Sequence, residues 1–210
     1  MGLGTLLFKN PLMFFILAVP LLYSVIAHEV AHGWVAYLFG DDTARRSGRL
    51  SLNPLPHLDL VGTIALFIVG FGWAKPVPVD FSRLRNFRLG LICVSLAGCL
   101  INIIIAAIAI FLLQFQNIRA NPFAATVLFV VARINIILAA LNLIPIPPLD
   151  GSKVLMGFLP DKARRGLAAL EPYGFFILVV LLFTGLLNPV IVFIQNIIVG
   201  LIGGLVGLFR

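Results

Sequence analysis

The sequence predicts an all-α polytopic membrane protein with about five to six transmembrane helices and a small re-entrant or β-hairpin element. Two observations carry this prediction. Of 210 residues, 61% are hydrophobic and only 11% are charged, whereas charged residues make up about a quarter of a soluble domain. The mean hydropathy is +1.12, and the apolar residues gather in long runs, several of them near the ~20 residues that cross a bilayer as a helix. A water-soluble globular domain is excluded, and residues 1–210 are predicted to form a single membrane domain.

Five stretches have the length or the apolar character of transmembrane helices: residues 11–39, 89–113, 123–146, 172–187 and 188–209. The break at Asn188-Pro189 makes the last two a candidate hairpin of short crossings. The final stretch contains two GxxxG spacings, which permit close helix packing, among Gly200, Gly203, Gly204 and Gly207. Packing inside the molecule is the favoured interpretation, and a homo-oligomer contact is the alternative.

Residues 61–73 form a sixth apolar stretch that is too short to span a bilayer comfortably. The surrounding segment, residues 49–79, is punctuated by prolines, which favours turns and extended chain over helix. Irregular backbone at membrane depth must be satisfied by protein or by a water-filled cavity. We therefore expect a re-entrant or β-hairpin element that lies against the interior of the protein.

The net charge of +7 does not indicate a nucleic-acid partner. The 15 Lys and Arg residues are scattered between apolar runs and form no basic stripe. In a membrane protein such an excess reports which loops face the cytosol. The bilayer is the partner that the composition implies, and nucleic acid is excluded.

The first apolar stretch contains an HExxH motif, His28-Glu29-Val30-Ala31-His32. On a helix the i,i+4 spacing places His28 and His32 on one face, where both imidazoles can bind a single Zn²⁺. Glu29 lies beside that face and can accept a proton from a zinc-bound water. A chance motif is disfavoured because two of the three histidines and one of the two glutamates cluster within an apolar span, where ionisable groups are costly.

A catalytic zinc site needs a third protein ligand. Position 38, where the metzincin pattern requires His, is Leu38, and Glu171 stands just before a proline in a different apolar run. His57 and the aspartates remain as candidates. Asp150 stands out because three prolines end the helix before it and Gly151 allows a turn after it, so that it projects from the unwound end. An ordinary surface turn is the alternative for Asp150.

HExxH in an early apolar helix, with NxxPxPxxDG from Asn142 to Gly151 at the end of a later one, resembles the site-2 protease family of intramembrane zinc metalloproteases. The segment GRLSLNPLPHLD followed by WAKPVPV looks like the short form of this family, without a PDZ domain. The resemblance covers most of the chain. In one departure, many members carry AGPxxN in the middle core helix, whereas this chain has Cys99 in place of the proline. We expect Cys99 to straighten that helix and leave the zinc site intact.

The resemblance implies one Zn²⁺ per chain, with His28, His32 and Asp150 as ligands and Glu29 as general base and acid. It also places Asn142 near the substrate, where the amide can hydrogen-bond the peptide or the developing oxyanion. The implied activity is that of an intramembrane zinc metalloendopeptidase. Such an enzyme hydrolyses peptide bonds in or near the transmembrane segments of membrane-protein substrates, in regulated intramembrane proteolysis.

The zinc hypothesis constrains the topology. His28, His32 and Asp150 lie near one membrane face only if residues 61–73 re-enter rather than cross. Lys9 and Arg119 then lie on one side, and eleven basic residues lie on the other: Arg45, Arg46, Arg49, Lys75, Arg83, Arg85, Arg88, Lys153, Lys162, Arg164 and Arg165. This asymmetry predicts a multi-pass protein whose active site faces the cytosolic side.

Four features have open alternatives. His57 is either a temporary metal ligand or a hydrogen-bonded loop residue, and Arg133 either snorkels or pairs with a buried acid. Residues 153–170 form either an amphipathic helix on the anionic leaflet or a solvated connector. Residues 73–79 are expected to hold an unwound substrate strand by β-addition, although two prolines reduce their donors.

The competing function is a membrane metal-binding or transport protein that holds an ion in transit on His28, His32 and Asp150. Glu29 discriminates between the two, because a transporter has little need for a carboxylate beside two histidine ligands. A non-catalytic relative is disfavoured because no element of the site is missing.

Overall fold

The computed structural model describes residues 3–68 and 72–207, and within these residues it is helical, without strands. Four helices are long and apolar enough to cross a membrane: α2 (Pro11–Leu38), α5 (Phe87–Leu112), α7 (Pro122–Asn142) and α11 (Asn188–Gly207). The shorter elements are α1 (Leu3–Lys9), α3 (Thr43–Arg46), η1 (Leu55–His57), α4 (Leu60–Ile68), η2 (Phe81–Arg83), α6 (Gln116–Arg119), α8 (Asp150–Phe158), α9 (Asp161–Ala168) and α10 (Glu171–Phe183). The predicted all-α membrane class is confirmed.

Asparagine caps begin three of the four long helices. The side chain of Asn10 accepts a hydrogen bond from the backbone of Met13, and Asn86 and Asn121 cap α5 and α7 in the same way. Each cap satisfies an amide that the first helical turn leaves without a partner. The polar caps therefore set where the apolar helices start, within two residues of the predicted starts.

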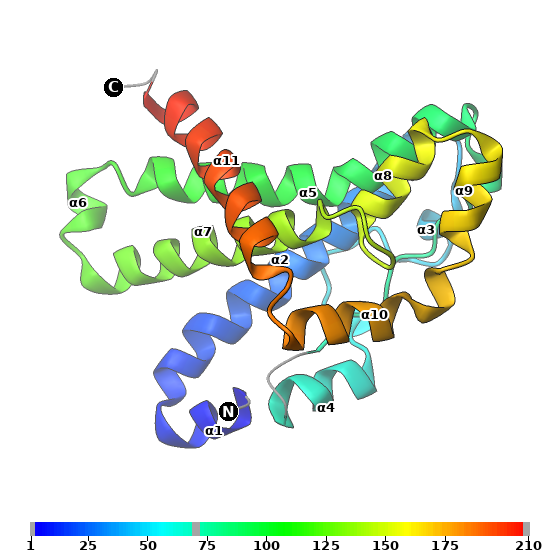
Figure 1. Cartoon of the computed structure of the whole chain (residues 1–210). Coiled ribbons are helices and arrows are strands. Elements are labelled where there is room, and N and C mark those ends of the chain that lie inside the picture. Colours follow the sequence, from blue (N-terminus) through cyan, green and yellow to red (C-terminus); the bar gives the residue numbers. More distant parts are fainter. Residues whose placement is uncertain (1–2, 69–71, 208–210) are drawn as a thin grey trace.

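Helix α5 packs against both α2 and α7 and forms the centre of the bundle (Figure 1). Small residues allow close approach of α5 and α7, since Ala106 and Ala139 are fully buried in a cluster that Ile198 and Ile202 of α11 complete. This core holds α2, which carries the HExxH motif, against α5.

The C-terminal pair, a candidate hairpin of short crossings, consists of one short helix and one helix of spanning length. Helix α11 reaches spanning length by itself, but α10 has 13 residues, about 20 Å of helix, against a hydrocarbon core of about 30 Å. Helix α10 is long enough to cross the membrane only if it is counted together with α9, from which it is separated by a bend of 64°. The described part of the chain therefore has four spans, or five if the bent pair counts as one.

The glycines of α11 do not pack inside the molecule, so the favoured interpretation of the GxxxG spacings is wrong. A Cβ added at Gly200, Gly203, Gly204 or Gly207 would meet no atom within 4 Å in the described structure. The helix instead buries Ile198, Ile202 and Val206. The larger side chains occupy the face of α11 that packs on the core, because their burial removes more apolar surface from contact with lipid or water than glycine would.

Residues 60–68 form helix α4, and the β-hairpin alternative for this region is therefore wrong in the described residues. Asp59 starts the helix, because its carboxylate accepts a hydrogen bond of 2.7 Å from the Gly62 amide. The prolines that favoured extended chain lie outside this run. Residues 69–71, within the predicted re-entrant stretch, lie outside the described residues.

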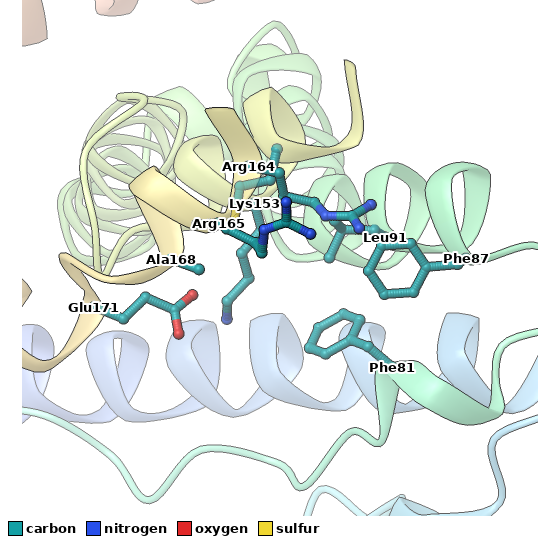
Figure 2. A pocket seen from close by; sticks show the side chains of 9 residues that line it. Phe81, Phe87, Leu91, Lys153, Arg164, Arg165, Ala168 and Glu171 are labelled. Carbon is teal, nitrogen blue, oxygen red and sulfur yellow. The ribbon is translucent and has the colours of Figure 1, made fainter. Parts of the chain in front are cut away.

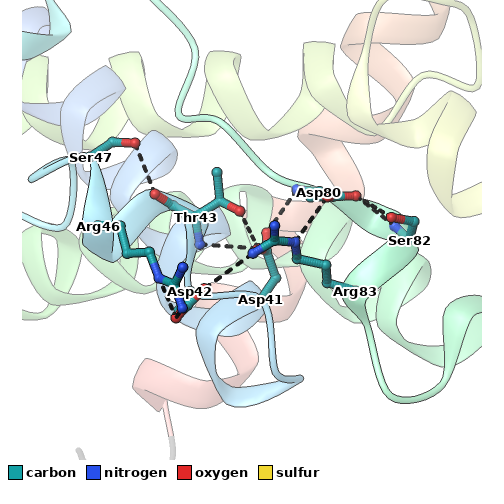
Figure 3. A network of polar contacts seen from close by, with 8 residues as sticks. All are labelled: Asp41, Asp42, Thr43, Arg46, Ser47, Asp80, Ser82 and Arg83. Carbon is teal, nitrogen blue, oxygen red and sulfur yellow. Dashed lines mark hydrogen bonds and ion pairs between the residues drawn. The ribbon is translucent and has the colours of Figure 1, made fainter.

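The end of α2 is tied to η2 by a polar network (Figure 3). The buried Asp41 carboxylate accepts hydrogen bonds from the backbone of Thr43 and from that of Asp80. Hydrogen bonds from the Ser82 hydroxyl and amide lower the pKa of the Asp80 carboxyl, which therefore stays ionised and pairs with Arg83 at 3.1 Å. The network fixes the far end of residues 72–80, a segment that is neither helix nor strand.

Candidate metal centre

Helix α2 places the two histidines of the HExxH motif one turn apart on its buried face. His28 and His32 are 6% and 8% exposed, and their Nε2 atoms lie 3.0 Å apart. His28 lies 17 residues after Pro11, about 25 Å along the helix, so the pair is close to the C-terminal third of the span. The sequence-predicted pair is thus brought together.

Asp150 joins the histidines from the start of α8. Its Oδ2 atom lies 3.0 Å from Nε2 of His28 and 3.2 Å from Nε2 of His32. Asp150 is the first residue of a helix rather than part of an unwound end, and Gly151 is helical rather than a turn residue. A Cβ at Gly151 would come within 2.4 Å of the Leu143 carbonyl oxygen, so the glycine is needed because the turn that follows α7 passes so close.

The hydrogen bonds of His32 determine its tautomer. Its Nδ1 lies 2.7 Å from the Val94 carbonyl oxygen, which can only accept, so Nδ1 carries the proton. Nε2 then presents a lone pair towards the Asp150 carboxylate. Two acceptors 3.2 Å apart repel unless a cation or a proton lies between them.

A metal ion fits this arrangement. The three ligand atoms of His28, His32 and Asp150 all lie within 4.8 Å of one another. Two imidazole nitrogens and one carboxylate oxygen are a donor set that zinc uses in open catalytic sites, with bonds of about 2.0–2.2 Å. The group leaves room in a four-coordinate site for one further ligand.

Helix α5 supplies residues that support the histidines, among them Gly98 and Asn102 of the AGPxxN-like sequence, whose role was not predicted from the sequence. Asn102 is fully buried and its amide lies 3.3 Å from Nδ1 of His28, while its Oδ1 has no hydrogen-bond partner in the described structure. Rotating the amide by 180° pairs Oδ1 with an Nδ1–H of His28 and leaves the Nε2 lone pair for a metal. In this orientation Asn102 stabilises the His28 tautomer that has its proton on Nδ1, which is the tautomer that can bind a metal through Nε2.

Gly98 provides the space for the His28 ring. A Cβ at this position would lie 2.5–2.6 Å from three ring atoms of His28. Val94, Gly98 and Asn102 follow each other at intervals of four, and so line one face of α5. The AGPxxN-like sequence of α5 contains Gly98 and Asn102 and was the available signal for both. Helix α5 runs without interruption through Cys99, while the expected straightening of the helix stays a prediction.

We expect Asn102→Leu to weaken zinc binding by about 10- to 100-fold, the usual effect of losing a hydrogen bond that orients a histidine ligand. Leucine has a similar volume but accepts no hydrogen bond. Zinc affinity measured by competition with a chromogenic chelator checks this expectation. An unchanged affinity would show that Asn102 does not orient His28.

Glu29 is held by residues 72–80. The Val77 amide donates a hydrogen bond of 2.8 Å to Oε2 of Glu29. Arg49, which is almost fully buried, donates to the carbonyl oxygens of Lys75 and Pro76 immediately before that amide. Arg49 therefore clamps the segment whose backbone orients Glu29 through its Oε2 atom.

Within the described residues, no hydrogen bond joins the other predicted residues to His28, His32 or Asp150. Asn142 ends α7 and donates its amide to the Leu138 carbonyl of its own helix, so its role towards substrate stays a prediction. His57 is fully buried, lies outside the metal-ligand group and contacts the Ser51 carbonyl at 2.9 Å, in agreement with the loop interpretation. Arg133 is exposed on α7 and has no ion pair within the described residues, which excludes a buried acid there as its partner.

The predicted substrate edge has few unused donors. In residues 72–80 the amide of Lys75 donates to the His57 carbonyl, that of Val77 to Glu29 and that of Asp80 to Asp41. Pro76 and Pro78 have no amide hydrogen. β-Addition to this segment stays a prediction, with the remaining donors concentrated around Trp73 and Ala74.

Comparison with known proteins points to one family. The model of "Peptidase family M50" matches residues 115–185. "Putative zinc metalloprotease YwhC" of Bacillus subtilis is 40% identical over 177 residues, which cover 81% of each chain. "Putative zinc metalloprotease Rip2" of Mycolicibacterium smegmatis is 35% identical over 80% of this chain and 66% of its own length. "Zinc metalloprotease MJ0392" of Methanocaldococcus jannaschii is 25% identical over 76% of this chain and 39% of its own. No solved structure matches.

Proposed function

Since this chain belongs to peptidase family M50, the site-2 protease family of zinc metalloproteases, we propose that it hydrolyses peptide bonds in or near the transmembrane segments of membrane-protein substrates. The observation that carries the proposal is the position of the ligand group. His28 and His32 belong to a membrane-spanning helix, and Asp150 meets them within the bundle. A peptidase with its ligands at this depth acts on bonds that a soluble protease does not reach.

In this proposal His28, His32 and Asp150 hold one zinc ion. The ion supplies Lewis acidity, which polarises the scissile carbonyl and lowers the pKa of water towards about 7. Val94 and Asn102 keep the imidazoles in the tautomers that leave Nε2 free to bind. The protein thereby assembles the ligand set before substrate arrives.

Glu29 is the proposed general base and acid. Its Oε2 is held by the Val77 amide, which leaves Oε1 to take a proton from the attacking water and return it to the leaving amine. Asn142 is the proposed contact to the substrate backbone. A substrate helix satisfies its carbonyls internally, so it must unwind locally before either residue can act on it.

The distribution of basic residues supports a cytosolic position of this end of the bundle. Helices α3, α8 and α9 lie at the opposite end of the bundle from α6 (Figure 1), and ion pairs join Arg88 to Asp161 and Arg83 to Asp42 there. The excess of basic residues thus lies at the end of the bundle that holds α3, α8 and α9. His28, His32 and Asp150 are closer to this end than to the end that holds α6. Accessibility of single cysteines placed in α3 and α6, tested with a membrane-impermeant maleimide, checks this orientation.

Replacing Arg49 by glutamine is expected to lower kcat by about tenfold or more while zinc content and KM change little, because the clamp on the Glu29 segment is lost. Arg46→Gln is the matched control, since Arg46 is exposed and, among the described residues, forms an ion pair with Asp42 alone. Steady-state kinetics and metal content of both variants make the measurement. Equal losses in the two variants would contradict the positioning role.

The proposed function is tested by reconstitution. Purified protein in lipid vesicles is mixed with a candidate transmembrane substrate, and the products are identified by mass spectrometry. We expect a cut within or beside the apolar segment, abolished by a zinc chelator and restored by Zn²⁺. Cleavage only in soluble, detergent-exposed tails would contradict the proposal.

A further inference from the structure

A basic cavity lies at the end of α5, away from the metal-ligand group. It has a volume of about 370 Å³ and is lined by Phe81, Phe87, Leu91, Lys153, Met156, Arg164, Arg165, Ala168 and Glu171. This volume is within the range of about 300–1,000 Å³ that is usual for small-ligand sites. Figure 2 shows the guanidinium groups of Arg164 and Arg165 above Phe81, and the Lys153 side chain reaching down between Glu171 and Phe81.

Two of the three cavity cations have no carboxylate partner among the described residues. The Nζ atom of Lys153 lies over the ring of Phe81, and the guanidinium of Arg164 lies over Phe87. Lys153 and Arg165 have no ion pair in the part of the chain that the structure describes, whereas Arg164 pairs with Asp161 at 3.1 Å. Asp161 also pairs with Arg88 at 3.2 Å. Four basic side chains, Lys153, Arg164, Arg165 and Arg88, thus lie with two carboxylates, Asp161 and Glu171, and this positive excess favours an anion.

The place of the cavity in the fold indicates an amphiphilic ligand. Phe87 and Leu91 belong to the first turns of the spanning helix α5, and Glu171 begins the apolar helix α10. The cavity is therefore at the level where lipid headgroups meet the hydrocarbon core. Its apolar lining includes the buried Leu91 and Met156, while its basic side chains come from α8 and α9. Basic pockets between helices at this level bind anionic headgroups.

We propose that this cavity binds one anionic phospholipid, whose phosphate is held by Lys153, Arg164 and Arg165 and whose glycerol and acyl carbons lie on Phe81, Phe87 and Leu91. Glu171 disfavours a bare anion but accepts hydrogen bonds from a hydroxyl-bearing headgroup, as in phosphatidylglycerol. The lipid bridges α5, α8 and α9. From the sequence alone, residues 153–170 were either an amphipathic helix on the anionic leaflet or a solvated connector. The proposal favours the first alternative and adds that these residues form a binding site for one lipid headgroup.

The test measures lipid retention by native mass spectrometry on the full chain in detergent, titrated with phosphatidylglycerol, phosphatidylcholine or inorganic phosphate. One phosphatidylglycerol is expected to bind at least about tenfold more tightly than phosphatidylcholine. Lys153→Gln and Arg165→Gln are expected to weaken it by about tenfold each, the ratio for a lost charge-assisted hydrogen bond, and Arg165→Lys to retain most of it. Unchanged zinc content and helical circular dichroism show that the variants are folded.

Lys162→Gln is the matched control, because it removes the same charge from an exposed position of α9 outside the cavity. A loss in Lys162→Gln equal to that in Arg165→Gln would mean diffuse attraction to anionic lipid and would overturn the site. If phosphatidylcholine were retained as tightly as phosphatidylglycerol, the proposed preference for an anionic lipid would be overturned. Stabilisation by inorganic phosphate equal to that by phosphatidylglycerol would identify a free-phosphate site and overturn the lipid assignment.

Discussion

Glu29→Gln is expected to reduce peptide hydrolysis by about 10²- to 10⁴-fold, the contribution of a positioned general base, while one zinc ion per chain is retained. The amide keeps the size of the carboxylate and can still accept the hydrogen bond from Val77, but it takes up no proton. Product formation from a reconstituted substrate and metal analysis of the same sample make the measurement. Because zinc stays bound, the loss separates proton transfer from metal binding.

The same variant decides between the two functions considered from the sequence. An ion transporter would keep its transport with glutamine at position 29, because His28, His32 and Asp150 are intact. Hydrolysis that continues at the wild-type rate in Glu29→Gln would rule out Glu29 as the base. Leu38→Ala, at the exposed end of the same helix, is the control for general damage to α2.

Gly98→Ala is expected to lower zinc affinity by about 100-fold or more and to remove activity with it. The new methyl group would lie 2.5 Å from the His28 ring, so the ring must move away from the ligand position. This effect is larger than the loss of a hydrogen bond to a ligand residue, which lowers metal affinity by about 10- to 100-fold. Zinc titration and thermal unfolding with and without zinc make the measurement.

Gly204→Ala is the matched control for Gly98→Ala. It adds the same methyl group to a glycine of another spanning helix, where no atom lies within 4 Å. Its zinc affinity and activity are expected to equal those of the wild type. If Gly98→Ala bound zinc as tightly as Gly204→Ala, the close contact between α5 and His28 would be contradicted.

The ligand group was predictable because its signals are local or chemically unusual. His28 and His32 are related by helix geometry alone, and Asp150 is distinguished by the prolines before it. The long helices were predictable from apolar length, and the asparagine caps agree with their starts within two residues. In each case few residues, close in sequence, carry the information.

The contacts of the supporting residues were not predictable, because they join distant parts of the chain. Asn102 and Gly98 contact His28, which is about 70 residues earlier in the sequence. Arg49 binds Lys75, which is 26 residues later and belongs to the segment that holds Glu29. Nothing in the HExxH motif specifies which face of α5 lies against it. The β-hairpin expected around residue 61 failed because Asp59 caps a helix, and the glycines of α11 face outwards because isoleucines occupy the core face.

The central claim is that His28, His32 and Asp150 hold one zinc ion, and the metal content of purified Asp150→Ala tests it most directly. Wild-type protein is expected to contain one zinc per chain, and Asp150→Ala to lose most of it under the same dialysis, because two imidazoles alone bind weakly. His57→Ala, which removes a histidine outside the group, is expected to retain one zinc. Unchanged zinc stoichiometry and affinity in Asp150→Ala, with loss in His57→Ala, would contradict the account and make His57 the third ligand.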